Sequence, residues 1–288
     1  MIYFCADDYG LCDNISAHIK QCIDMGALNK VSVCPNFGPI KLPEVVNEKN
    51  FRVSLHLNLV EGRCMADAKE INLIADRDGN FIHTFGGLLR LGVFKRREVE
   101  AQLYKEIKAQ VLYWKTALPD GVPFCVDSHQ HTHMIPAVFK TLLRVLKDER
   151  IEPEYIRIPA EPLMPYIMTP SLYFTYRLIN IVKQWLLKIL WQINKRQAIK
   201  YHVPTSYFMG ILFSGRMDSG RVNVVLPKYI KMAERDGKDI EVLFHPGYLD
   251  ETEKNLKEKN IVFEKFYLSK DRKTEFDSVI NISKGSVL

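Results

Sequence analysis

Four groups of polar side chains that could bind a metal ion or transfer protons follow segments expected to be β-strands. They are Asp7-Asp8, His56, Asp127-Ser128-His129 and His245. Carboxylates and imidazoles are donors that divalent ions take in hydrolytic sites, where open positions remain for water and substrate. We therefore predict that Asp8, His56 and His129 hold one divalent ion.

Two further residues could transfer protons beside such an ion. A bound ion lowers the pKa of its water towards ~7, and Asp7 could then take a proton from that water. Since neighbouring residues of a strand point to opposite faces, Asp7 and Asp8 can both face the site only if the chain turns there. Gly10 permits that turn. His245, which precedes a Pro-Gly pair, is the candidate to protonate a leaving amine.

Simpler explanations remain open for single residues. An aspartate pair after a strand is also typical of a helix cap, and a lone histidine is often structural. The HQHTH segment is harder to explain structurally because it crowds three imidazoles together. Two of these, His131 and His133, could contact substrate or orient the metal ligands.

The elements that would position these residues alternate between strands and helices. Short β-favouring runs are expected at 2–6, 31–34, 52–59, 124–128, 155–158, 207–213 and 239–244. Helical patterns lie between most of them, as in a parallel sheet. About seven strands favour an α/β fold, a closed or nearly closed (β/α) barrel of the TIM type. The loops that follow the strands of such a barrel share one face, so the four groups would converge there.

We expect residues 1–288 to form a single barrel domain with two insertions. The first, at about 60–96, is expected to be irregular, as lids and binding loops often are. The second, at about 163–206, is expected to be helical. Within it, residues 171–195 combine a broad apolar helical face with a basic stripe of Arg177, Lys188 and Lys195.

Two kinds of partner fit this helical insertion. Its apolar runs are too short to span a bilayer. The helix could pack over the barrel or form a homodimer interface. Alternatively, it could touch a membrane surface or meet a glycolipid substrate.

Composition and charge exclude several classes of protein. The chain has 288 residues, six cysteines without a C-x-x-C pair, and a net charge of +6. Disorder and disulfide-stapled scaffolds do not fit these values. Residues 163–217 contain seven basic residues and no acidic one, so the basicity is local and no nucleic-acid partner is expected. The N-terminal sequence lacks a secretory signal pattern, so we expect a cytoplasmic protein, with the inner membrane surface as a peripheral site.

Four motifs together resemble the YdjC-like carbohydrate deacetylases. They are ADDYGLCDNIS, SLHLNLVEG, VDSHQHTHM and FHPGYLDE, in the family's order and spanning residues 6–251. That family includes chitooligosaccharide deacetylases and hopanoid-biosynthesis-associated proteins, and is related in fold to NodB-type deacetylases.

The resemblance implies a barrel hydrolase that removes the acetyl group from N-acetylated sugars with one divalent ion, usually Mg²⁺, with Zn²⁺-like ions as the alternative. It places metal ligands, catalytic groups and substrate contacts on the following residues: Asp8, His56 and His129 as ligands; Asp7, His245 and Arg157 as catalytic groups; Asn58, Glu61, His131 and His133 against substrate. Arg157 would act by pairing with Asp7. A metal-dependent phosphoesterase and a non-catalytic sugar-binding barrel are the competing hypotheses.

Overall fold

The computed structural model describes residues 1–249 and 264–284, which fold around one sheet of seven strands. The strands are β1 (Ile2–Tyr9), β2 (Lys30–Val33), β3 (Arg52–Leu57), β4 (Cys125–Ser128), β5 (Tyr155–Ile156), β6 (Tyr207–Met209) and β7 (Ile240–Phe244). All six pairings between neighbouring strands are parallel. The predicted α/β class with about seven strands is therefore confirmed.

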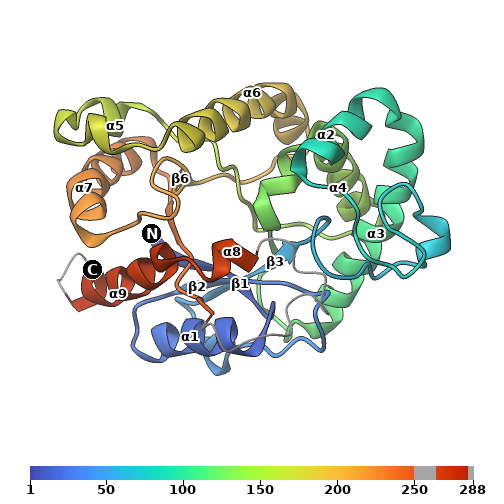
Figure 1. Cartoon of the computed structure of the whole chain (residues 1–288), viewed down its shortest axis with the longest axis horizontal. Helices are drawn as coiled ribbons and strands as arrows, with labels where there is room; N and C mark the ends of the chain where they lie inside the picture. Colours follow the sequence, from blue (N-terminus) through green and yellow to red (C-terminus); the bar gives the residue numbers. More distant parts are fainter. Residues whose placement is uncertain (250–263, 285–288) are drawn as a thin grey trace.

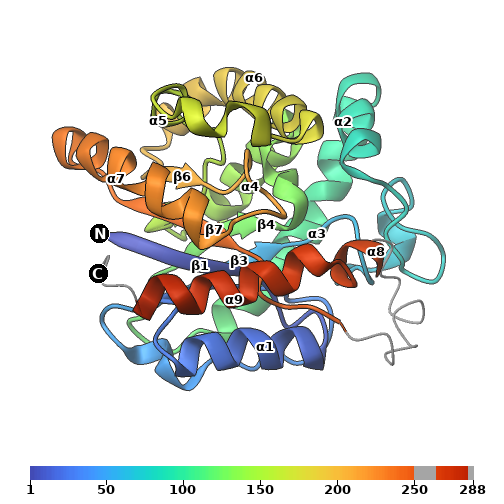
Figure 2. The same ribbon diagram turned by 60° about the vertical axis from the view of Figure 1, so that its left-hand side comes forward.

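Helices surround this sheet (Figures 1 and 2). They are α1 (Asp13–Asp24), α2 (Phe85–Phe94), α3 (Arg96–Ala117), α4 (Pro136–Asp148), α5 (Met164–Ile167), α6 (Leu178–Lys200), α7 (Ser219–Asp236), α8 (Glu264–Tyr267) and α9 (Lys270–Lys284). In both views α1 and α6 lie on opposite sides of the molecule. Within residues 1–249 and 264–284, no helix has the length and hydropathy that crossing a bilayer requires.

The core lies between the sheet and these helices. Strands β2 and β7 are buried along their whole length, as expected when helices cover both faces of a parallel sheet. Helix α4 buries Val138, Leu142 and Val145 at helical spacing, and it packs against α3 and α6. The strands are thereby fixed with their carboxyl ends at one edge.

The sheet is open in the described part of the chain, so a closed TIM-type barrel is not confirmed. Its order is β5-β4-β3-β2-β1-β7-β6, which leaves β5 and β6 at the two edges. These strands have two and three residues, too few for an extended ladder. Side chains span the interval between them instead, since Ser206 Oγ donates to Tyr155 Oη over 3.2 Å.

Three predicted elements differ in the structure. The 60–96 insertion is not wholly irregular, because it contains helix α2. The side chain of Thr84 caps this helix by accepting a hydrogen bond from the backbone N–H of Gly87. Between β2 and β3, where the alternation of strands and helices predicts a helix, the chain forms only a 3₁₀ turn at Glu44–Asn47. The helix predicted at 171–195 is divided, since Pro170–Thr175 form a 3₁₀ turn and Arg177 is extended before α6 begins.

Candidate active site

The end of β1 turns so that two adjacent aspartates face the same site. The β1–β2 register shifts between Ala6 and Tyr9, and Asp8 has a φ of 74°. A left-handed conformation at a residue other than glycine costs about 1–3 kcal/mol and is often found at functional sites. Gly10, with a φ of 88°, completes the turn against Cys34. The turn that the sequence required for Asp7 and Asp8 is thus present.

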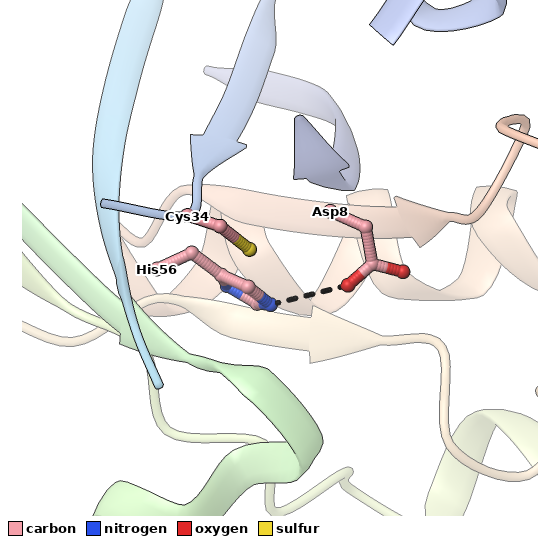
Figure 3. A group of neighbouring side chains, drawn as sticks. All are labelled: Asp8, Cys34 and His56. Atoms are coloured by element: carbon pink, nitrogen blue, oxygen red, sulfur yellow. Dashed lines mark ion pairs between the residues drawn. The ribbon is translucent and has the colours of Figure 1, made fainter. Parts of the chain in front are cut away.

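Asp8 is the centre on which both imidazoles converge. His129 Nδ1 lies 2.9 Å from Asp8 Oδ1. His56 Nε2 lies 3.6 Å from the same oxygen, the contact drawn as a dashed line in Figure 3. Two ligands that each bind one ion at about 2.1 Å lie roughly 3.0–3.4 Å apart. The Asp8–His129 distance lies just below this range and the Asp8–His56 distance just above it, so a shared cation would have to adjust both. Arg272 Nη2 holds the other oxygen of Asp8 at 2.9 Å.

Each imidazole has a carboxylate on its far nitrogen. His56 Nδ1 lies 2.6 Å from Asp127 Oδ1, and His129 Nε2 lies 3.0 Å from Glu61 Oε2. Tyr267 donates to Glu61 as well. Metal-binding histidines almost always pair their second nitrogen in this way, which fixes the ring and raises its basicity. This arrangement is the one that surrounds metal-binding histidines, so the cluster could hold a metal ion.

The buried charged side chains around Asp8 carry more negative than positive permanent charge unless a further cation is present. Ion pairs connect five buried carboxylates with three permanent cations: Asp7, Asp8, Glu61, Asp127 and Glu241 with Lys30, Arg157 and Arg272. Burial lowers the pKa of His56 and His129, but nearby Asp7 and Asp8 outweigh it and raise the pKa to about 9 and about 10. Two imidazolium charges, or one divalent ion, would neutralise the excess.

Asp7 is held as a carboxylate by Arg157. Arg157 donates through Nη1 and Nη2 to the two oxygens of Asp7 at 2.7 and 2.8 Å. Glu241 accepts from Arg157 Nε at 2.8 Å and pairs with Lys30 at 2.9 Å, so the guanidinium is itself fixed. Burial alone would raise the pKa of Asp7, but the charges of Arg157 and His56 hold it well below its usual range.

Among the described residues, two sets of three donors have all their ligand atoms within 4.8 Å of one another. They are Asp8–Cys34–His56, drawn in Figure 3, and Asp7–His56–Asp127. Burial, reinforced by nearby carboxylates, raises the pKa of the Cys34 thiol well above its ordinary value, so the thiol is a poor ligand. Asp7 and Asp127 are both paired with Arg157. The set of Asp8 with His56 and His129 is not one of these two compact sets; Arg272 pairs with one oxygen of Asp8, and the other oxygen faces both imidazoles.

A cavity of about 380 Å³ opens onto these groups. Its floor includes Asp7, Asp8, His56, His129 and His245. Its walls are mainly apolar and come from α2, α6, the segment after β6, and α8: Phe85, Leu186, Leu187, Ile211, Phe266 and Tyr267. Polar groups converging at the base of an apolar pocket are typical of a small-molecule site.

The three histidines of the HQHTH segment do not share a face. Gln130 and His131 both adopt left-handed conformations, with φ of 53° and 57°, and the chain therefore turns between His129 and His133. His131 lines the cavity. His133 is buried instead, with one nitrogen on Ser128 Oγ and the other 2.7 Å from the Arg157 carbonyl, and burial lowers its pKa to about 4.

Asn58 and Glu61, predicted to meet substrate, are fully buried and absent from the described cavity wall. Asn58 Oδ1 accepts from the backbone of Val60 and Glu61, which shapes the loop after β3. Glu61 lies behind His129, as described above. Of the four residues predicted to contact substrate, His131 is the one placed in the cavity.

His245 follows β7 directly and lines the cavity. Its backbone N–H donates to Glu275 Oε2 at 2.6 Å, and its Nδ1 lies 3.4 Å from the same oxygen. Its charge also contributes to the low pKa of Asp7. Asp250 and Glu251, the end of the fourth motif, lie outside the described residues.

Sequence reasoning missed the contribution of the C-terminal helices. Arg272 reaches Asp8 from α9 while its guanidinium stacks 4.3 Å from the Phe266 ring centre and 4.6 Å from that of Tyr267. No sequence pattern distinguishes Arg272 from other charges of α9. Asp127 was visible within VDSHQHTHM, two residues before His129, but the sequence did not indicate that it pairs with His56.

The sequence is similar to one protein family and to several known proteins. The family profile described as YdjC-like protein matches residues 1–282. The chain is 31% identical over 159 residues to a carbohydrate deacetylase of Danio rerio, covering 54% of this chain and 49% of that protein. A carbohydrate deacetylase of Clostridium beijerinckii is 24% identical over 191 residues, covering 64% of this chain and 73% of that protein.

The chain spans about half the length of the first of these relatives. A solved structure from Enterococcus faecalis, described as a putative cellobiose-phosphate cleavage protein, superposes with a TM-score of 0.64 at 13% identity, over 98% of this chain and 92% of that one. This likeness concerns the fold. The match of the family profile to nearly the whole sequence shows that the chain belongs to the YdjC-like family.

Proposed function

We propose that this protein is a metal-dependent hydrolase that removes the acetyl group from an N-acetylated sugar. One observation carries the proposal: two imidazoles, each with a carboxylate behind it, converge on Asp8 beside a second aspartate that an arginine holds. The names of the relatives, carbohydrate deacetylases, agree with it.

Asp8, His56 and His129 would hold the ion. When bound, a divalent ion would polarise the acetyl carbonyl and activate water. Imidazole donors suit Zn²⁺ and similar transition ions, whereas Mg²⁺ prefers oxygen. We therefore favour a Zn²⁺-like ion over the Mg²⁺ that the family resemblance suggested.

Asp7 and His245 would transfer the protons. Asp7 remains ionised because of Arg157, and both its oxygens are oriented, so it can accept a proton from the attacking water. His245 would donate a proton to the departing sugar nitrogen, with Glu275 fixing its backbone. The apolar walls of the cavity would exclude bulk water.

The competing phosphoesterase hypothesis is less well supported by the same geometry. Two-metal phosphoesterases need additional free ligands for a second ion about 3.5–4 Å away. Here Asp7 and Asp127 are committed to Arg157. The alternative of a non-catalytic sugar-binding protein is distinguished from an enzyme by an assay of acetate release.

The test is acetate release from N-acetylglucosamine and its oligomers by protein stripped of metal and reloaded with Mg²⁺, Mn²⁺ or Zn²⁺. We expect turnover only in reloaded protein. His129→Ala should lose the metal, and the exposed control Asp13→Asn should match wild type. Absence of acetate release across the panel, with metal bound, would favour the sugar-binding alternative.

A further inference from the structure

Helix α6 differs from an ordinary surface helix because it buries polar as well as apolar side chains and exposes large apolar ones. Half of its buried positions are polar: Asn180, Gln184 and Asn194. These amides bond to backbone carbonyls of Leu212, Ser214, Glu161 and Met134. Hydrogen bonds therefore hold α6 against the body of the protein, where a surface helix usually presents apolar side chains.

The outward side of α6 carries large apolar residues. We define the apolar ridge as Leu178, Ile179, Val182, Trp185, Ile189 and Ile193, whose exposure is between 55% and 76%. Phe174, in the preceding turn, is fully exposed. Contiguous exposed apolar surface of this kind marks an interaction site. In both Figures 1 and 2 this helix lies at the periphery, with α5 beside it.

Charge identifies the kind of partner. Residues 163–217 contain seven basic residues and no acidic one. Five of the basic residues belong to α6, and none of them has an acidic partner within 4.0 Å among the described residues: Lys183, Lys188, Lys195, Arg196 and Lys200. The partner that fits is apolar at its centre and negatively charged around it.

A second copy of the chain does not meet this requirement. A twofold dimer places the same patch of both subunits in contact. The ridges would then bring two sets of basic side chains together without an acidic residue from 163–217 to balance them. An anionic lipid surface supplies both the apolar interior and the negative headgroups.

We propose that α6 docks the protein on an anionic membrane surface through its apolar ridge. Lys183, Leu186 and Leu187, on the neighbouring side of the same helix, line the cavity that contains Asp7 and Asp8. Docking would place this cavity beside the lipid. If the proposed deacetylase function holds, its substrate is then an N-acetylated sugar carried on a lipid.

The experiment is co-sedimentation of the full chain with vesicles of phosphatidylcholine alone or with about 30 mol% phosphatidylglycerol, at low and high salt. We expect binding to the anionic vesicles only, weakened by salt. Trp185→Ser/Ile189→Ser and Lys195→Glu/Arg196→Glu should each reduce the bound fraction about tenfold. Val224→Ser and Lys231→Glu, exposed on α7, are the matched controls and should bind like wild type.

Three results would overturn the docking proposal. They are no binding to anionic vesicles, binding that the ridge variants leave unchanged, and a dimer in analytical ultracentrifugation that Trp185→Ser dissociates. Thermal unfolding verifies that each variant is folded. Acetate release from a soluble sugar requires no vesicles, so it tests the proposed function separately from docking.

Discussion

Metal binding should release protons from the two imidazoles that converge on Asp8. In the metal-free protein, His56 has a pKa of about 9 and His129 of about 10, so both are protonated near neutral pH. A histidine must lose its proton to bind a metal. Binding of Zn²⁺ at about pH 7.5 should therefore release about two protons, and roughly one and a half at about pH 9.

Calorimetry measures this number directly. The observed enthalpy of Zn²⁺ binding is plotted against the ionisation enthalpy of several buffers, and the slope is the number of protons released. Repeating the titration at about pH 9 should lower the slope to roughly one and a half, because His56 is then about half deprotonated. A slope near zero for the wild type at about pH 7.5 would refute the reasoning, since the ion would then not displace imidazolium protons.

Four further outcomes follow from the site. Asp7→Asn should retain metal, measured by elemental analysis, while kcat for acetate release falls about 10²–10⁴-fold; normal turnover would exclude Asp7 as the base. Arg157→Met should lower the free energy of unfolding in urea by about 3–5 kcal/mol because it leaves buried carboxylates unpaired, and a loss below about 1 kcal/mol would contradict this. Glu61→Gln should weaken metal affinity about 10–100-fold while exposed Glu70→Gln should not. The metal-free protein should lose stability as pH rises from about 6.5 through about 10, because the raised pKa values of the two imidazoles stabilise it only while they are protonated; melting temperatures constant over that range would show otherwise.

The convergence of the site residues could be predicted from the sequence, because it depends on where each residue lies relative to the end of its strand. Asp8 and His129 follow strand ends, and parallel strands bring their carboxyl ends to one edge. The turn at Asp8 was also predictable, since two adjacent residues of a regular strand could not both face the site. The pairing of Arg157 with Asp7 entered as an implication of the family resemblance, and the structure contains that ion pair.

Features set by tertiary packing were not predictable. Alternation of strands and helices gives no information on whether β5 and β6 meet, so the sequence could not decide between a closed and a nearly closed barrel. Arg272 reaches Asp8 because α9 packs against α1 and α7, which no local pattern encodes. The amphipathic pattern of α6 was visible, but which side faces the protein depends on amide contacts such as Asn194 with the Met134 carbonyl.

The central claim is that Asp8, His56 and His129 bind one divalent ion beside Asp7. Anomalous X-ray diffraction at the Zn absorption edge, from crystals of the loaded protein, tests it most directly. We expect a single strong peak within bonding distance of one Asp8 oxygen and one nitrogen of each imidazole, with Asp7 unbound. A peak between Asp7, His56 and Asp127, or no peak near Asp8, would contradict the account.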